Sequence, residues 1–171
     1  MLDAGTFENN LADLFTTAPA ERQDAARSWA DAYLHYVRQA QAGPCFRSTA
    51  TDVASRLALE TTLVSMFART YPDRSAKDAA LDFQSAFLAF WLSPPQLFLP
   101  APATVGILSI VPPTLAGLLL PVLKSNSMLT GETGSRTAAS RFASIIDGWT
   151  RTIIVAVTVT PPGTPVPTPL T

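Results

Sequence analysis

Charged side chains are absent from the middle of the sequence, where residues 83–123 contain no Asp, Glu, Lys or Arg. Across all 171 residues the charged fraction is 15%, well below the roughly 25% usual in soluble domains. Hydrophobic residues make up 47% of the chain, and its mean hydropathy is +0.22. Neutral polar groups, lipid or partner proteins must therefore cover much of the surface of the folded chain.

Residues that carry chemistry are also scarce, with one cysteine (Cys45) and one histidine (His35). A lone cysteine cannot form an internal disulfide and is more often a small buried hydrophobe than a nucleophile. Metal sites need several converging His, Cys or carboxylate ligands, which this pair cannot supply. Asp78 and Asp82 stand four residues apart on a predicted helix, a spacing that is more typical of solvated surface acids than of a catalytic pair.

The sequence motifs of nucleophile and nucleotide sites are missing too. Neither G-x-S-x-G, G-x-G-x-x-G nor a P-loop occurs. We therefore expect a non-enzymatic protein that has no catalytic, metal-binding or cofactor-binding residues and uses no cofactor.

The charge distribution limits the partners and the location. A net charge of −1 lacks the basic excess that is typical of nucleic-acid binding, so we expect no nucleic-acid partner. The N-terminal segment carries its acids before its first base, Arg22, and lacks the apolar core of a secretory signal. We expect the chain to stay in the cytoplasm in which it is made.

Apolar residues recur at helical spacing through most of the chain and predict a mainly α fold. The predicted helices cover residues 6–15, 19–42, 52–71, 75–92, 113–124 and 136–148. Gly43 and Pro44 should stop the second helix, Ser75 and Asp78 resemble a capping box that starts the fourth, and Pro121 should kink or end the fifth. Short connections indicate an antiparallel helical bundle. Its predicted core includes Trp29, Tyr33, Trp91, Phe142 and Trp149.

Two segments predict strands. Residues 104–111 are short, β-branched and bounded by prolines, and residues 151–160 alternate between two faces. Residues 125–134 have the glycines and hydroxyls of an exposed loop. Residues 161–171 contain five prolines and predict a polyproline-like or disordered arm. The expected organisation is one domain, residues 1–160, with a small C-terminal β element and a proline-rich terminal arm.

The predicted strands also suggest how copies of the chain could associate. An isolated strand is unstable, so 151–160 should pair with 104–111 in the same chain or in the next one. The edges of such an apolar ribbon invite strand addition by another subunit, and the arm could lie on a neighbour. The residues predicted to carry assembly are Val105, Ile107, Ile110, Ile153, Val155, Val157, Val159, Pro161 and Pro165.

Membrane insertion is the main alternative, because residues 105–123 are uncharged and approach the length of a helical span. A holin-like protein could use such a segment. However, Pro112, Pro113 and Pro121 would leave backbone carbonyls without donors in lipid, and the flanks lack an aromatic belt or a basic cluster. We therefore expect a membrane partner to be less favoured than protein partners. A third possibility is a small enzyme or ligand carrier that uses the aromatic core.

Four stretches carry a family resemblance: SWADAYLHY, AFWLSPPQLF, VGILSIVPP and DGWTRTIIVAVTVTPPGTP closing on PLT. Together they make most of the chain similar to small uncharacterised structural proteins of tailed bacteriophages and related contractile tail machines. The resemblance implies a virion or tail component, present in many copies around a symmetry axis and bound to copies of itself and to other virion or tail proteins. It would be found in the host cytoplasm during assembly and then in the particle.

Overall fold

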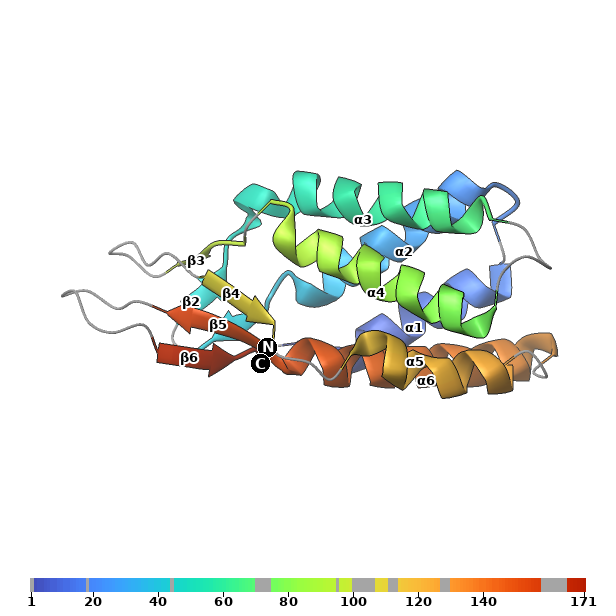
Figure 1. Cartoon of the computed structure of the whole chain (residues 1–171). Coiled ribbons are helices and arrows are strands. Elements are labelled where there is room, and N and C mark those ends of the chain that lie inside the picture. Colours follow the sequence, from blue (N-terminus) through green and yellow to red (C-terminus); the bar gives the residue numbers. More distant parts are fainter. Residues whose placement is uncertain are drawn as a thin grey trace.

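Six α-helices form in the part of the chain that the computed structural model describes, which is residues 2–17, 19–43, 45–69, 75–94, 96–99, 107–110, 114–126, 130–157 and 166–171. They are α1 (Ala4–Thr17), α2 (Arg22–Val37), α3 (Asp52–Phe67), α4 (Ala76–Leu92), α5 (Leu115–Asn126) and α6 (Gly131–Arg151). Successive helices run in alternate directions (Figure 1). Each helix packs against the next, and α6 packs against α1. The mainly α bundle predicted from periodicity is therefore confirmed.

Local sequence signals explain the start of α4. The Ser75 hydroxyl accepts a hydrogen bond from the backbone N–H of Asp78 at 3.2 Å, and the Asp78 carboxylate accepts one from the backbone N–H of Ser75 at 3.1 Å. This is the predicted capping box, which satisfies two N–H groups that the helix itself leaves unpaired. It fixes the first residue of the helix that carries Phe83, Phe87 and Phe90 into the core.

The second helix was predicted too long. It ends at Val37 rather than at residue 42, and it starts at Arg22 rather than at Pro19. Gly43 has a left-handed φ of +58° and makes a turn between two short strands. Antiparallel strand pairing on either side of this turn uses residues that the apolar periodicity had assigned to the helix.

The last two helices also differ from expectation. Helix α5 continues through Pro121, which lies exposed on its outer side together with Gly117, so that water can reach the carbonyl that the proline leaves unbonded. Helix α6 starts at Gly131, inside the segment predicted as an exposed loop, and runs past Gly148. Gly134 is buried within it, despite the low helix propensity of glycine.

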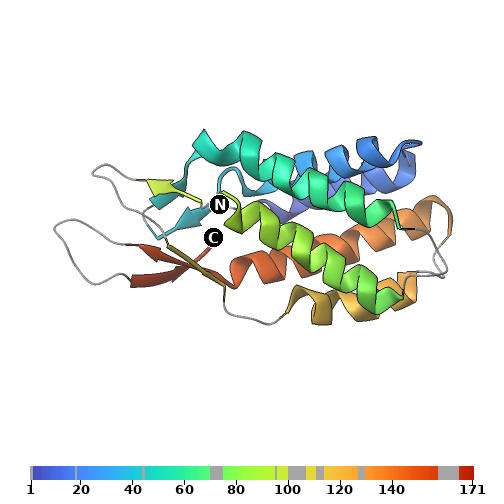
Figure 2. The same cartoon turned by 45° about the horizontal axis from the view of Figure 1, so that its top comes forward.

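Two three-stranded antiparallel sheets lie at one end of the bundle, near both termini (Figures 1 and 2). The first has the order β1-β2-β3, with strands Gln41–Ala42, Cys45–Arg47 and Phe98–Leu99. The second has the order β4-β5-β6, with strands Ile107–Ile110, Ile153–Val157 and Val166–Pro169. The predicted strands 104–111 and 151–160 correspond to β4 and β5, and they pair within one chain.

The C-terminal residues join the two sheets. Leu170 pairs with Ala42, and the backbone groups of Thr171 and Gln41 exchange two hydrogen bonds of 3.0 and 3.1 Å. The six strands are therefore arranged in the order β4-β5-β6-β1-β2-β3. The prediction of a polyproline-like or disordered arm is wrong for residues 166–171, because strand pairing on both sides orders them; residues 161–165 lie outside the described part of the chain.

Tyr33 is at the centre of the core. Its ring packs edge-on against Phe87 and Phe90 at centroid distances of 4.6 and 5.0 Å. Its hydroxyl accepts a hydrogen bond from the Trp91 indole at 2.7 Å and is hydrogen-bonded to the Thr150 hydroxyl at 3.0 Å. Burial raises the pKa of Tyr33 far above that of an exposed tyrosine. The five predicted core residues, Trp29, Tyr33, Trp91, Phe142 and Trp149, are all buried.

Replacing Phe87 by Ala should lower the free energy of unfolding by about 3–5 kcal/mol, because it removes a fully buried ring and leaves a cavity among aromatic neighbours. Phe46→Ala is the matched control: that ring is 56% exposed, and its loss should cost no more than about 1 kcal/mol. Urea denaturation of both variants measures the difference. Equal losses would contradict the assignment of the core.

Candidate interaction surface

The structure brings together some of the residues predicted to carry assembly. Ile110 lies opposite Ile153 and Ile107 opposite Ala156 in the β4–β5 ladder, so both strands are already paired within the chain. The other members of the set on β5 are Val155 and Val157. The remaining members, Val105, Val159, Pro161 and Pro165, lie outside the described residues.

This pairing changes which strands could receive a neighbour. Strand β5 lies between β4 and β6, so the main-chain groups on both of its sides have partners in the same chain. Strand addition at Ile153–Val157 is therefore excluded while the sheet is intact. Among the described strands, β4 (Ile107–Ile110) and β3 (Phe98–Leu99) are the outer members of the six-strand order, where main-chain groups can accept another strand.

An apolar patch that the sequence reasoning missed covers the outer face of β2 and β3. Phe46 lies directly opposite Leu99, and the two side chains are 56% and 46% exposed. Leu97 is exposed just before β3, whereas Phe98 between the two leucines is buried against the bundle. Little in the sequence signalled this patch, because neither Cys45–Arg47 nor residues 97–99 alternate between apolar and polar residues and both segments are too short to predict strands.

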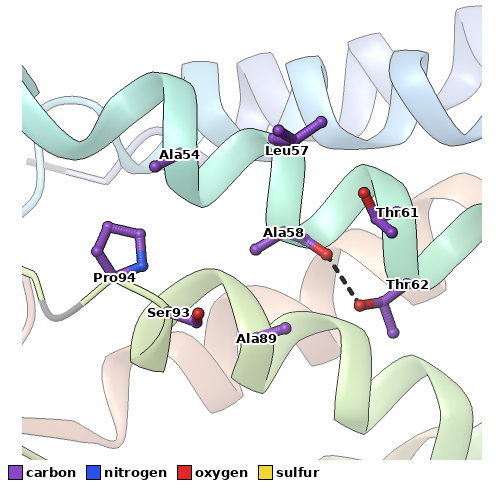
Figure 3. Close-up of a pocket in the computed structure, with 8 residues that line it drawn as sticks. All are labelled: Ala54, Leu57, Ala58, Thr61, Thr62, Ala89, Ser93 and Pro94. Atoms are coloured by element: carbon purple, nitrogen blue, oxygen red, sulfur yellow. Dashed lines mark hydrogen bonds between the residues drawn. The ribbon is translucent and has the colours of Figure 1, made fainter.

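A second uncharged surface lies between α3 and α4. A groove of about 590 Å³ separates the two helices, with Ala58 on one side and Ala89 on the other (Figure 3). Its lining residues are Ala54, Leu57, Ala58, Thr61, Thr62, Ala89, Ser93 and Pro94. Leu57 is 56% exposed at the groove, and Val53 one turn earlier on α3 is 80% exposed. Because no lining side chain titrates, the groove is suited to apolar contact rather than to acid–base chemistry.

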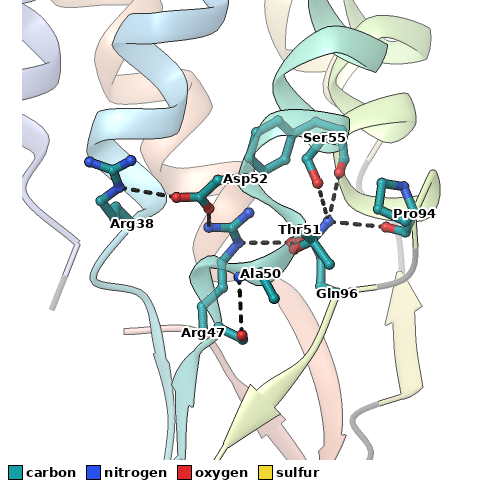
Figure 4. A network of polar contacts seen from close by, with 10 residues as sticks. Arg38, Arg47, Ala50, Thr51, Asp52, Ser55, Pro94 and Gln96 are labelled. Carbon is teal, nitrogen blue, oxygen red and sulfur yellow. Dashed lines mark hydrogen bonds and ion pairs between the residues drawn. The ribbon is translucent and has the colours of Figure 1, made fainter.

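A buried polar network anchors the sheet end to these two helices (Figure 4). Arg47, whose side chain is fully buried, donates to the Asp52 carboxylate at 2.6 Å and to the Gln96 side-chain oxygen at 2.8 Å. Its guanidinium carbon is 5.2 Å from the centre of the Phe90 ring. Arg38, which is half exposed, donates to the second Asp52 oxygen at 3.1 Å. The network thus joins β2, the end of α2 and the first turn of α3.

Gln96 extends the network to the end of α4. Its amide nitrogen donates to the Ser55 hydroxyl at 2.7 Å and to the carbonyls of Phe90 and Pro94 at 2.9 and 3.1 Å. Helix α4 leaves its last carbonyls without helical partners, so this side chain caps the helix from a residue that follows it. Apolar periodicity gave no sign of this role, because a polar side chain that follows the helix does not contribute to the periodic pattern.

The described residues show little of the geometry that catalysis or metal binding needs. Among them, no three His, Cys, Asp or Glu side chains converge. Cys45 is buried, as expected for a small apolar residue, and burial raises the pKa of its thiol. Asp78 is part of the capping box, and Asp82 accepts hydrogen bonds from Arg69. The candidate interaction surfaces are therefore the apolar patch on β2 and β3 and the groove between α3 and α4.

The described helices also bear on the membrane alternative. None of them combines the length and the apolar character that crossing a bilayer requires.

Comparisons with known proteins assign no family to this chain. Neither protein-family models, curated proteins nor solved structures gave a match to this chain.

Changing Asp52 to Asn should lower the free energy of unfolding by about 3 kcal/mol, because the buried Arg47 guanidinium loses its counter-charge. Asp31→Asn is the matched control. Asp31 pairs with Arg56 at the surface and is 54% exposed, so its loss should cost less than about 1 kcal/mol. Urea denaturation of the two variants checks the ratio, and a similar small loss for both would show that Arg47 does not depend on the carboxylate.

Proposed function

We propose that this chain is a non-enzymatic structural component of a phage virion or phage-like contractile tail, and that it works by packing against copies of itself and against other proteins of the particle. The observation that carries the proposal is the uncharged α3–α4 surface, where Leu57 and Val53 are exposed beside a groove. Soluble monomers seldom expose large contiguous apolar areas, and such areas commonly mark protein contacts. The resemblance of the sequence to phage structural proteins supports a phage virion or phage-like tail as the particle to which the chain would belong.

The chemistry of this surface indicates how it would bind. Exposed Leu and Val gain stability by leaving water, whereas the small Ala and Thr side chains that line the groove allow a partner to approach closely. Ion pairs contribute little there, because no charged side chain of the described residues lines the groove and the cluster of Arg56 with Asp31 and Glu60 on α2 and α3 is satisfied within the chain. Association through the groove should therefore depend weakly on salt.

The arrangement of the helices supports a role as a rigid subunit. The helices close into a ring around aromatic side chains, and the Arg47–Asp52–Gln96 network attaches the sheets to that ring. A subunit that must hold one shape within a symmetric assembly benefits from a core of this kind.

Leu57→Glu should weaken self-association at least about tenfold, because the new carboxylate would have to be buried in an apolar contact. Ser144→Glu is the matched control, since it adds the same charge at an exposed position on α6. Size-exclusion chromatography with light scattering over a range of protein concentrations gives the association constants, repeated at two salt concentrations.

Two results would contradict the proposal. A wild-type chain that is monomeric at every concentration, alone and with particle components, would remove the packing role. Mass spectrometry of purified particles from the source of the chain should detect it in many copies, and its absence from them would remove the virion or tail assignment.

A further inference from the structure

We propose that the terminal strand, residues 166–171, is exchanged between two copies of the chain, so that the strand of each copy fills the slot between β5 and β1 of the other. This inference deepens the proposed function and rests on it, since it adds to the α3–α4 groove a second contact through which copies of the chain would bind one another. The partner is a second copy of this chain, and the site is the slot that its own terminal strand fills in the structure.

The slot has main-chain partners on both sides. On one side, β6 pairs with β5 from Val166 opposite Val157 to Pro169 opposite Ile154, and the Leu170 N–H donates to the Ile153 carbonyl at 3.2 Å. On the other side, Thr171 exchanges two hydrogen bonds with Gln41. A strand from a second copy would make the same bonds with the same residues, so exchange requires no new surface.

The Leu170 side chain anchors the terminal strand in the interior. Leu170 is 2% exposed, and its strand neighbours Ile153 and Ala42 are fully buried. Thr168 is half-buried and Pro169 is exposed. The aromatic side chains around Tyr33 belong to the helices, so withdrawing the strand leaves the ring of helices in place. Local opening of such a strand at the edge of the bundle costs less free energy than global unfolding.

The prolines of the strand determine which side of it is available. The Leu170 N–H points to β5 and the Thr171 N–H points to β1, and successive residues of a strand alternate in this respect. Pro167 and Pro169 are therefore oriented like Thr171, with the backbone nitrogen facing away from β5. Because proline has no N–H, the strand lacks hydrogen-bond donors at these two positions on the side away from β5. The ladder with β5 stays intact, whereas the other side can pair with β1 only near the C-terminus.

This asymmetry favours exchange over open-ended strand addition. A strand whose free side lacks donors at two positions is a poor template for further strands, but it fits a slot that offers β5 on one side and Gln41–Ala42 at its end. Eight residues, 158–165, connect β5 to the terminal strand. When extended, a chain of that length reaches about 26 Å, which allows delivery to an adjacent copy.

Paired cysteines distinguish the closed chain from the exchanged one. Gln41 and Thr171 are directly opposite each other, and the roughly 5.5 Å between the Cα atoms of such pairs suits a disulfide. Cys45→Ala removes the native thiol. In that background, Gln41→Cys and Thr171→Cys are made in separate chains, which are mixed, unfolded, refolded together, oxidised and separated on a non-reducing gel. Exchange predicts a covalent heterodimer in the mixture, and each variant alone serves as the control.

The double variant Gln41→Cys/Thr171→Cys gives a second, independent readout. If the strand is exchanged, oxidation of the oligomer links two chains; if it is not, the link forms within one chain. An oligomer that carries only the internal link, together with a mixture that gives no heterodimer, would overturn exchange and leave the proposed function standing. A chain that is monomeric throughout would overturn both. A covalent dimer that persists in the Leu57→Glu background would support exchange while removing the groove as the self-association surface.

Discussion

The buried Arg47 guanidinium is the constraint on which the arrangement of the sheet end depends. A fully buried charge is tolerated only when a counter-charge and hydrogen-bond acceptors surround it. Here Asp52 supplies the charge, Gln96 supplies an oxygen, and the Phe90 ring faces the guanidinium. These partners come from three separate parts of the chain. Completing the network around Arg47 therefore requires strand β2, the first turn of α3 and the end of α4 with the residues that follow it to be in place together.

Charged side chains outside this network also pair within the chain. Arg56 pairs with Asp31, and Arg151 pairs with Asp147. Burial and its hydrogen bond to Asp147 raise the pKa of Tyr36, so the tyrosine stays neutral beside that carboxylate. The uncharged run from residue 83 supplies core residues up to Trp91 and then the patch around Leu99. Its low charge thus has two distinct consequences, a dense core and an apolar outer face.

The sheets at the end of the bundle give the chain both closure and a route to association. The terminal strand closes the six-strand order by pairing with β5 and β1, and this places the C-terminus beside the N-terminus (Figure 1). A strand that completes a sheet within one subunit can complete the same sheet in a neighbour, because main-chain hydrogen bonds do not distinguish the two. The α3–α4 groove lies on the helical part, so the two contacts involve different surfaces of the subunit.

The sequence by itself determined the helical class, most of the core and the pairing segments. Tyr33, Trp91 and Trp149 follow apolar periodicity, and the Ser75–Asp78 capping box is a local interaction that needs no tertiary context. The tertiary structure decided the rest: residues 41–47 form a hairpin, Gln96 caps α4 from outside the helix, and residues 166–171 join two sheets. Thr171 bonds to Gln41 across most of the chain, whereas the hairpin and the Gln96 cap join residues that are close in sequence. None of these hydrogen bonds leaves a periodic pattern of apolar residues, which is why the sequence did not reveal them.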